Sequence, residues 1–372
     1  MKQLIHVFFI CLLCTSCSLT GSKTQLQILG KDAISLTGIP VYSDSILWGS
    51  YLIDLMDGRL INIYFRKQPF FWTYRLDGDS LLYENRFLYP GEGPNEMMNP
   101  SCHVDQVNQR FFLYSTTNGG QIGRFYKISV RPFSNLYYPE SWEKIVCPQR
   151  KNFTWSSQNN VFEMLNDSTV IGLGGDNQGS NLLSMFTLGG DTIIDLPVSL
   201  PDDRNTSKPI VRRLVYNEGA IRKRESANQI LYYCYKGNYA EIITFGEDDT
   251  ITRKVLVNDY PLYETAKDGF NRTYKMDCLM GLKAYTTDRF IYLFAWPLRK
   301  KEELQHLDYK GYSSTFNDYI YVFDWEGNYI KSYFLDTPID YFVVSQDDSF
   351  LLGSTCDLET GDYYVRKFYL NQ

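Results

Sequence analysis

One pattern recurs along the chain: a polar turn followed by an apolar, aromatic-rich run of five to seven residues. Near-continuous apolar runs of this length are typical of strands that are buried on both faces. Six copies follow one another at intervals of roughly 50–60 residues, which indicates a repeat architecture. The polar turns are Asp57-Gly58-Arg59, Asn108-Gln109-Arg110, Asn166-Asp167-Ser168, Ala227-Asn228-Gln229, Thr287-Asp288-Arg289 and Gln346-Asp347-Asp348.

A second element, a hairpin with a Gly or acidic turn, follows most copies. Asp-Gly, Gly-Asp and Gly-Asn between strand-like runs favour hairpins, because these residues tolerate the positive φ that matches strand twist. The second copy, at residues 125–130, lacks a clear Gly. Each unit therefore holds about four strands. The hairpin turns contain Gly78, Gly189 with Gly190, Gly246 and Gly327.

Six four-stranded antiparallel units predict an all-β, six-bladed β-propeller over residues 24–372, because radial repetition leaves only short edges. The last unit ends one strand short, and residues 25–29 are expected to supply its outer strand and close the ring. A pair of β-sandwiches is the alternative fold, but the near-constant unit length counts against it. No segment is expected to form a helix, and a charged insertion at about residues 298–316 interrupts the fifth unit.

The N-terminus has the layout of an export signal. Lys2 precedes an apolar stretch from Leu4 to Leu13, which is too short for a membrane span of about 20 residues. Residues 13–17 then resemble a bacterial lipobox, with a small residue before Cys17, although Cys14 stands where Leu is usual. The resemblance implies a signal peptide at residues 1–16, lipidation of Cys17 with palmitate-type chains, and a lipidated tether at residues 17–23. An ordinary secretory signal is the alternative.

Charge and cysteine content narrow the function classes. The chain carries 37 basic and 43 acidic residues, a net charge of −6, which leaves no electrostatic footprint for nucleic acid. Beyond the signal region five cysteines remain. Their odd number leaves at least one thiol unpaired within the chain, and the sequence does not determine which of the others pair. The five are Cys102, Cys147, Cys234, Cys278 and Cys356.

A short loop between the first and second units carries a family resemblance. Gly91, Glu92, Gly93, Pro94, Asn95 and Glu96 form a GxGPxE core, which resembles the signature of the TolB-like six-bladed propeller lipoproteins of Gram-negative bacteria. The resemblance implies the fold and an envelope location. Ser18 rather than Asp after the anchor favours the outer membrane, and because no acidic run follows, the periplasmic side is favoured over surface display. The resemblance carries over no catalytic residue. The loop is a candidate ligand site, or else a rigid connector in which Glu96 accepts backbone N–H bonds.

Most signals for catalysis, metals and cofactors are absent. The two histidines beyond the signal, His103 and His306, are not accompanied by HExxH or CxxC, so we expect no metal and no cofactor. The Gly-rich residues 172–179 lack the Lys and Ser or Thr of a P-loop and are interpreted as a loop. The basic clusters 208–213 and 222–224 could meet an anionic ligand, but a solvated face is the favoured interpretation.

Two functions remain open. The first is a non-enzymatic propeller, held at the membrane by its N-terminal lipid, that binds a protein, peptide or glycan. The alternative is a hydrolase or lyase with a carboxylate-based site at the mouth of the propeller channel. The alternative requires inward-facing Asp, Glu, Arg and Tyr side chains within hydrogen-bond reach of one another, and a scattered or apolar channel would exclude it.

Overall fold

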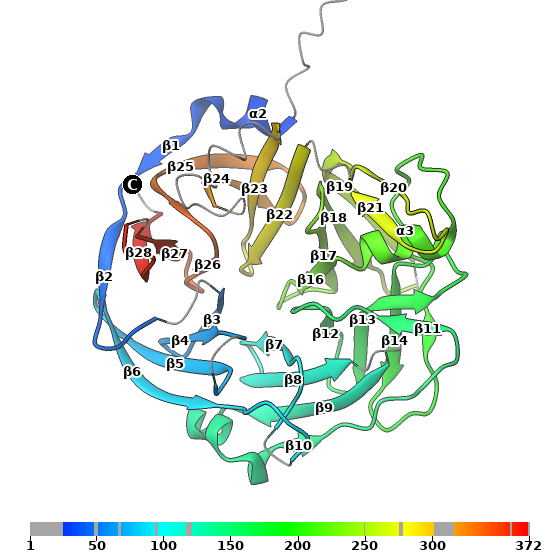
Figure 1. Cartoon of the computed structure of the whole chain (residues 1–372), viewed down its shortest axis with the longest axis horizontal. Helices are drawn as coiled ribbons and strands as arrows, with labels where there is room; N and C mark the ends of the chain where they lie inside the picture. Colours follow the sequence, from blue (N-terminus) through cyan, green and yellow to red (C-terminus); the bar gives the residue numbers. More distant parts are fainter. Residues whose placement is uncertain are drawn as a thin grey trace, which may run out of the picture.

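The strands form six blades around a central channel (Figure 1). The computed structural model describes residues 25–47, 51–65, 68–93, 96–116, 121–248, 250–274, 278–300, 316–357 and 359–370. Within these ranges the predicted six-bladed β-propeller of four-stranded antiparallel blades is confirmed.

Each blade begins with the strand nearest the channel. The first blade contains β3 (Tyr51–Met56), β4 (Arg59–Ile63), β5 (Phe71–Asp77) and β6 (Ser80–Phe87). The second contains β7 (Ser101–Asp105), β8 (Arg110–Thr116), β9 (Ile122–Ser129) and β10 (Glu143–Lys144). The third contains β12 (Phe162–Met164), β13 (Thr169–Asp176), β14 (Leu183–Thr187) and β15 (Ile194–Asp195), with β11 (Phe153–Trp155) also paired to β13.

The remaining blades follow the same order. The fourth contains β16 (Gly219–Lys223), β17 (Gln229–Cys234), β18 (Asn238–Phe245) and β19 (Ile251–Asp259). The fifth contains β22 (Cys278–Thr286), β23 (Phe290–Lys300), β24 (Asn317–Asp324) and β25 (Tyr329–Ile339). The sixth contains β26 (Phe342–Val344), β27 (Phe350–Cys356) and β28 (Tyr363–Tyr369), and its outer strand is β2 (Ile39–Ser43).

All six polar turns connect the first strand of a blade to the second, as the repeat predicts. The apolar runs after the turns are the second strands, and side chains at their centres are buried between neighbouring blades: Ile61, Phe112, Ile171, Leu231, Leu293 and Leu352. The turns follow the ends of the first strands, so they lie on one side of the ring, which we call the polar-turn face. The opposite connector face carries the longer links between blades.

Two of these links have secondary structure of their own. Helix α3 (Pro209–Tyr216) precedes the fourth blade, and the hairpin of β20 (Tyr263–Thr265) and β21 (Arg272–Tyr274) precedes the fifth. Figure 1 views the ring from this connector face. Three short 3₁₀ segments complete the described elements: Gly30–Asp32, Phe133–Tyr137 and Pro139–Ser141.

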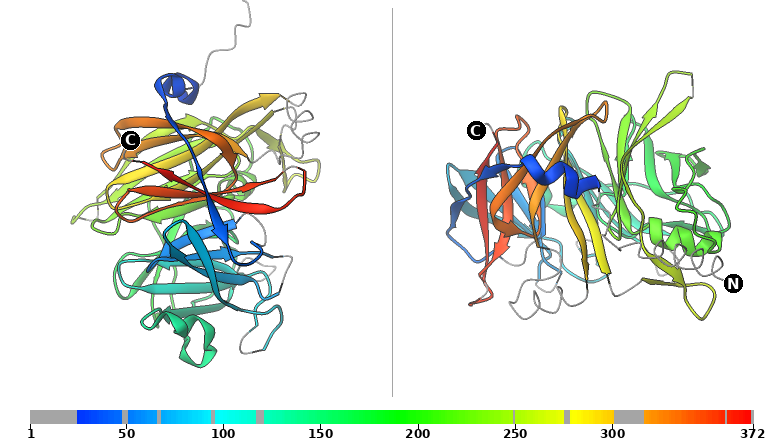
Figure 2. Two further views of the ribbon diagram at one scale, coloured as in Figure 1. Left: turned by 90° about the vertical axis from the view of Figure 1, so that its left-hand side faces the viewer. Right: turned by 90° about the horizontal axis from the view of Figure 1, so that it is seen from above.

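The N-terminal region closes the ring, but with a different strand from the one expected. Ile39–Val41 of β2 pair antiparallel with Val365–Lys367 of β28, and Tyr42 and Ser43 then pair parallel with β6 of the first blade. β1 (Ile34–Leu36) adds a parallel edge to β25, and Figure 2 shows these blue segments along the outer side of the last blades. The expectation for residues 25–29 is wrong, because they form helix α2 (Gln25–Leu29), whose Leu26 is buried among side chains of the fourth and fifth blades.

Helix α3 contradicts the expectation that no helix forms. Pro209 occupies the start of the helix, where its missing N–H costs nothing, and Val211, Val215 and Tyr216 are buried. Arg213 is buried with them and donates to the carbonyl oxygens of three residues in and after β13, namely Asp176, Gly179 and Asn181. Burial lowers the pKa of Arg213 to about 10.

The Gly-rich residues 172–179 also differ from the prediction, because their first half lies in β13 rather than in a loop. A Cβ atom on Gly175 would lie 2.5 Å from a guanidinium nitrogen of Arg213, and one on Gly172 would lie 2.5 Å from the ring of Trp155. These glycines therefore serve close packing, not phosphate binding.

Several predictions fall outside the described residues: the signal peptide 1–16, Cys17 and the tether 17–23, Pro94 and Asn95 of the loop, His306, and residues 301–315 of the charged insertion, whose first residues belong to β23. Among the described residues, no helix is long and apolar enough to cross a membrane. Four cysteines of the propeller, Cys102, Cys147, Cys234 and Cys356, are unpaired thiols.

Candidate functional site: the central channel

Four polar side chains from four blades meet inside the channel. We call this group the septum: Asp54 of β3, Gln106 after β7, Arg222 of β16 and Tyr285 of β22. Nη1 of Arg222 lies 3.4 Å from Oδ2 of Asp54, and the hydroxyl of Tyr285 donates to Oδ1 of Asp54 at 2.6 Å. The amide of Gln106 donates to the same carboxylate oxygen and, at 2.9 Å, to the Tyr285 hydroxyl oxygen.

The septum residues are buried, and they hydrogen-bond or ion-pair mainly with one another. Asp54 is 1% exposed and Arg222 is 8% exposed. Burial alone would lower the pKa of Arg222, but attraction to Asp54 raises it, so the guanidinium stays charged. Burial raises the pKa of Tyr285 far above its usual value, so its hydroxyl remains a donor. These groups therefore divide the channel into two chambers and offer little to a substrate.

The acidic chamber opens on the polar-turn face. It is a cavity of about 360 Å³, and residues of all six blades line it. Its polar lining comes from the ends of the first strands and from the turns that follow them. The charged and polar members besides the septum are His103, Glu163, Lys223, Glu225, Ser226, Thr286, Thr287, Asp288 and Gln346, with Val104, Val107 and Val344 as apolar members.

His103 and Glu163 form a buried pair at the wall of this chamber. Nε2 of His103 lies 3.0 Å from Oε2 of Glu163, and both side chains are less than 5% exposed. Burial alone would lower the pKa of His103, but attraction to Glu163 raises it. Oε1 of Glu163 accepts the backbone N–H of Lys223 at 3.1 Å. Neither ring nitrogen of His103 has a partner in hydrogen-bond geometry among the described residues.

Glu225 is the most perturbed carboxyl of the chamber. Burial, together with the negative charges of Glu163 and Asp105, raises its pKa from 4.5 to about 8, while His103 and Lys223 oppose the shift less strongly. At neutral pH the carboxyl is therefore mainly protonated. The described residues form no ion pair with Glu225, and His103 and Lys223 only partly offset the negative charges of Glu163 and Asp105 around it.

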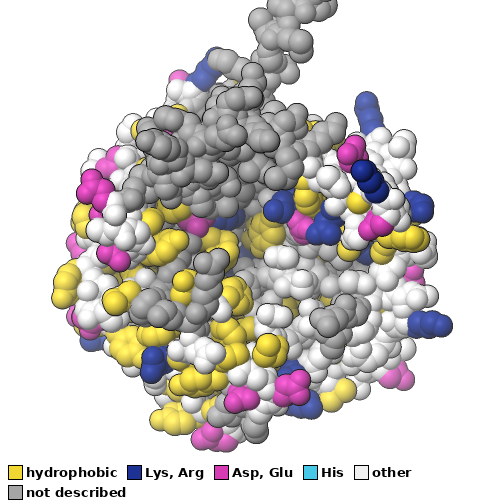
Figure 3. Space-filling model, in the orientation of Figure 1, with side chains coloured by type: hydrophobic (Ala, Val, Ile, Leu, Met, Phe, Trp, Pro, Cys, Tyr) yellow, Lys and Arg dark blue, Asp and Glu magenta, His cyan; other side chains and the backbone are white. Residues whose placement is uncertain are grey.

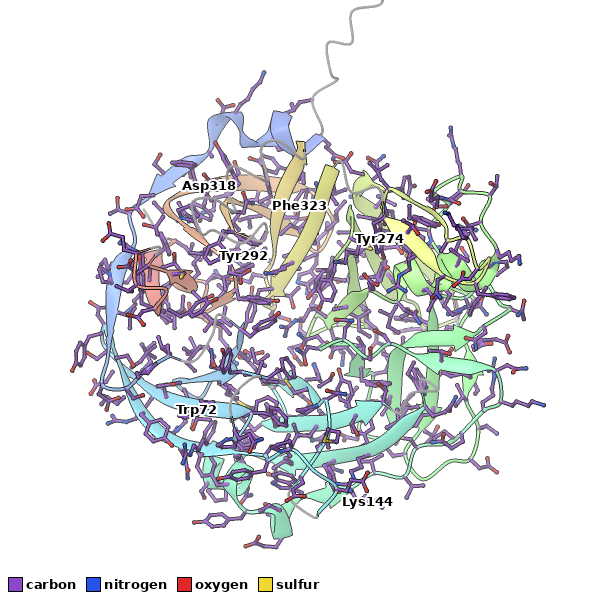
Figure 4. All side chains as sticks on the ribbon, viewed as in Figure 1. Trp72, Lys144, Tyr274, Tyr292, Asp318 and Phe323 are labelled. Carbon is purple, nitrogen blue, oxygen red and sulfur yellow. The ribbon has the colours of Figure 1, made fainter. Side chains whose placement is uncertain are left out.

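The tyrosine chamber lies beyond the septum, at the connector face. It is a cavity of about 250 Å³ between the starts of the first strands, and Arg222 lines both chambers. Lys283 is buried there and donates to Oδ1 of Asp340 at 2.6 Å, and its Nζ lies 3.4 Å from the centre of the Tyr341 ring. Burial lowers the pKa of Lys283, although Asp340 opposes the shift. Figure 4 shows how densely side chains fill the space between the blades.

The candidate loop at residues 91–96 lies apart from both chambers. None of its described residues, Gly91, Glu92, Gly93 and Glu96, lines either cavity. The Gly93 N–H donates to Oε2 of Glu96 at 2.9 Å, and the guanidinium of Arg124 on β9 donates to the carbonyl oxygens of Glu92, Gly93 and Glu96. The described part of the loop thus has a well-bonded backbone. A ligand on the loop stays a prediction.

Sequence patterns alone do not identify the residues that the channel brings together. The prediction of a solvated face for the basic cluster 222–224 is wrong at Arg222, which is buried. The ring brings Arg222 of the fourth blade to Asp54 of the first. A signal was present: Gln106, Glu225, Asp288 and Gln346 all lie in or beside the six repeated polar turns. Among the described residues, no three His, Cys, Asp or Glu side chains are grouped to hold a metal ion.

The fold and axial chambers define a six-bladed β-propeller with its candidate site on the ring axis. Residues 218–347 match the family model described as TolB-like 6-blade propeller-like, so the resemblance is confirmed for that part of the chain. The lipobox-like segment and the GxGPxE loop lie outside the match.

Two solved structures are similar to this chain over most of its length. One is a member of the DUF4221 family from Bacteroides vulgatus, with a TM-score of 0.52 and 10% identity, over 91% of this chain and 96% of that chain. The other, from Bacteroides fragilis, is described as a candidate exported protein, with a TM-score of 0.49 and 13% identity over 90% and 94% of the two chains. No curated protein matches the chain. At 10% identity, the similarity to the Bacteroides vulgatus protein shows a shared fold and nothing further.

Removal of the septum carboxylate should destabilise the ring. We expect Asp54→Asn to lower the free energy of unfolding by about 3–5 kcal/mol, because Arg222 would remain buried without its counter-charge. Chemical denaturation monitored by tryptophan fluorescence measures the change. The matched control is Asp167→Asn, whose side chain is 87% exposed in a surface ion pair, and it should stay within about 0.5 kcal/mol of the parent. Equal stability of the two variants would contradict a structural septum.

The acidic chamber should make stability depend on pH. The folded protein holds the Glu225 proton more tightly than the unfolded chain does, so the stabilisation is complete below pH 4.5 and declines as the pH rises to about 8. The raised pKa of His103 acts in the same direction. Denaturation curves from pH 4.5 to 9 should show a decline that is shallower in Glu225→Gln and unchanged in Glu247→Gln, an exposed hairpin residue. An identical decline in Glu225→Gln would refute this assignment.

Proposed function

We propose that the chain is a non-catalytic binding lipoprotein of the cell envelope, whose acidic chamber receives a basic side chain of a partner protein or peptide. The observation that supports this most is Glu225, a carboxyl near Glu163 and Asp105 that forms no ion pair with the described residues. Carboxylates close together disfavour each other's ionisation, and an incoming cation relieves that cost.

The size and lining of the chamber suit the aliphatic stem of a lysine. About 360 Å³ lies within the range of small ligand sites, roughly 300–1,000 Å³. Val104, Val107 and Val344 offer apolar contacts for methylene groups, while the charged head would reach Glu225. Nδ1 of the buried His103 ring has no hydrogen-bond partner among the described residues and belongs to the same lining.

The hydrolase or lyase alternative keeps one specific observation in its favour. Asp, Arg and Tyr do cluster in the channel, and Glu225 has a pKa of about 8 beside Glu163, whose carboxylate is held by His103 and a backbone N–H. A carboxyl group that holds its proton near neutral pH can act as a general acid. The septum members of the cluster, however, are occupied with one another. Turnover of a bound peptide or glycan, followed by mass spectrometry, would favour the enzyme.

Binding of a lysine side chain is the direct test. We expect NMR titration to show binding of the peptide acetyl-Gly-Lys-Gly-amide, and at least five-fold weaker binding of its acetyl-lysine counterpart, because acetylation removes only the charge. Affinity should rise from pH 6.5 to 9 as Glu225 ionises.

Charge reversal supplies the control for that test. Glu225→Lys should abolish binding, whereas Glu247→Lys, on an exposed hairpin of the same blade, should leave it unchanged. Equal affinity for the charged and acetylated peptides would exclude a cation site, and preferential binding of neutral oligosaccharides would favour a glycan ligand instead.

The membrane anchor is a separate part of the proposal. We expect metabolic labelling with palmitate in a Gram-negative host to mark the full chain and Cys14→Ser, and to be lost in Cys17→Ala, because the acyl chains attach to the Cys17 sulfur. Fractionation should place the labelled protein in the outer membrane. Persistent labelling of Cys17→Ala would refute lipidation at Cys17. It would not affect the proposal for the acidic chamber.

A further inference from the structure

The tyrosine chamber differs in chemistry from the acidic chamber on the other side of the septum. Five blades contribute to it, and four tyrosines line it: Tyr51, Tyr233, Tyr235 and Tyr341. The Tyr51 and Tyr341 rings are tilted against each other with centroids 4.3 Å apart, and Phe65 packs edge-on against Tyr51 at 6.1 Å. Figure 3 shows hydrophobic side chains gathered on this face, mainly over the first blade.

The charge of this chamber is positive. Asp340 neutralises Lys283, and Asp54 neutralises Arg222 from the far side of the septum. Lys236 is exposed at the mouth and forms no ion pair with the described residues. Its Nζ lies 5.7 Å from the ring centre of Tyr274 on β21, which Figure 4 labels. One cation therefore remains to meet an anionic group.

Two residues that line this chamber carry a buried polar atom with unused hydrogen-bonding capacity. Oδ1 of Asn160 and Nε of Arg222 are buried and have no hydrogen-bond partner among the described residues. Gln158 and Asn159 add amides to the lining of the chamber. Oδ1 of Asn159 already accepts the backbone N–H of Cys102 at 3.1 Å, so its NH₂ group is the part left for a ligand. Buried polar groups normally find partners, so an acceptor and a donor that lack them indicate a place where a ligand completes the set.

We infer that the tyrosine chamber binds a single sugar unit that carries a carboxylate. The tyrosine rings provide flat, partly apolar surfaces with hydroxyl groups at their ends, which suit a sugar ring. Amides carry donors and an acceptor in a fixed geometry and match neighbouring sugar hydroxyls. Lys236 pairs with the carboxylate. A volume of about 250 Å³ is below the usual range for larger ligands, roughly 300–1,000 Å³, and favours one ring over a peptide.

Three probes of matched size test this inference: glucuronate, glucose and benzoate. In NMR titrations of the full propeller we expect glucuronate to bind at least ten-fold more tightly than glucose, which lacks the carboxylate, and than benzoate, which lacks the hydroxyls. Equal affinity for glucose would overturn the role of the charge. Equal affinity for benzoate would overturn the sugar and leave a plain anion site.

Variants locate the binding and separate it from the proposed function. Lys236→Gln should weaken glucuronate binding at least ten-fold with little effect on glucose, and Asn159→Ala should weaken both. Lys151→Gln, an exposed lysine in the connector before the third blade, is the matched control and should bind as the parent does. Glu225→Lys, in the other chamber, should also leave glucuronate binding unchanged. Unaltered glucuronate affinity in Lys236→Gln would overturn the site.

Discussion

The buried pair of Arg222 and Asp54 holds the centre of the ring. A charge in this position is costly unless its partner is present, so the pair is favourable only when the first and fourth blades stand opposite each other at the correct distance. Tyr285 and Gln106 also donate to Asp54, so the fifth and second blades must be correctly placed as well. A propeller built only on apolar contacts between neighbouring blades would lack this constraint across its channel.

The same septum gives the two faces of the channel different chemistry. First strands run through it in one direction, so their starts line one chamber and their ends line the other. Carboxyl groups from the polar turns gather at the ends, where Glu225 forms no ion pair with the described residues. Tyrosines and Lys236 gather at the starts. The septum lies between the two chambers, and Arg222 is the described residue that lines both of them.

The blades themselves depend on ordinary packing. Second strands are buried on both faces between neighbours, and the ring closes because β2 completes the sixth blade before the chain enters the first. Arg213 and the glycines of β13 show the accuracy of this packing, since a single Cβ on Gly175 would occupy the place of the guanidinium. Packing in the core therefore fixes the strands that carry the channel residues.

The sequence by itself determined the repeat: six polar turns, each before a strand buried on both faces, because local turn chemistry and apolar runs are readable without tertiary contacts. It did not determine that residues 25–29 form a helix, because five residues carry too little periodicity and their burial depends on the fourth and fifth blades. Nor did the sequence predict the contact between Asp54 and Arg222, which are 168 positions apart. Ring closure decides which blades face each other, and therefore which polar residues become the candidate site.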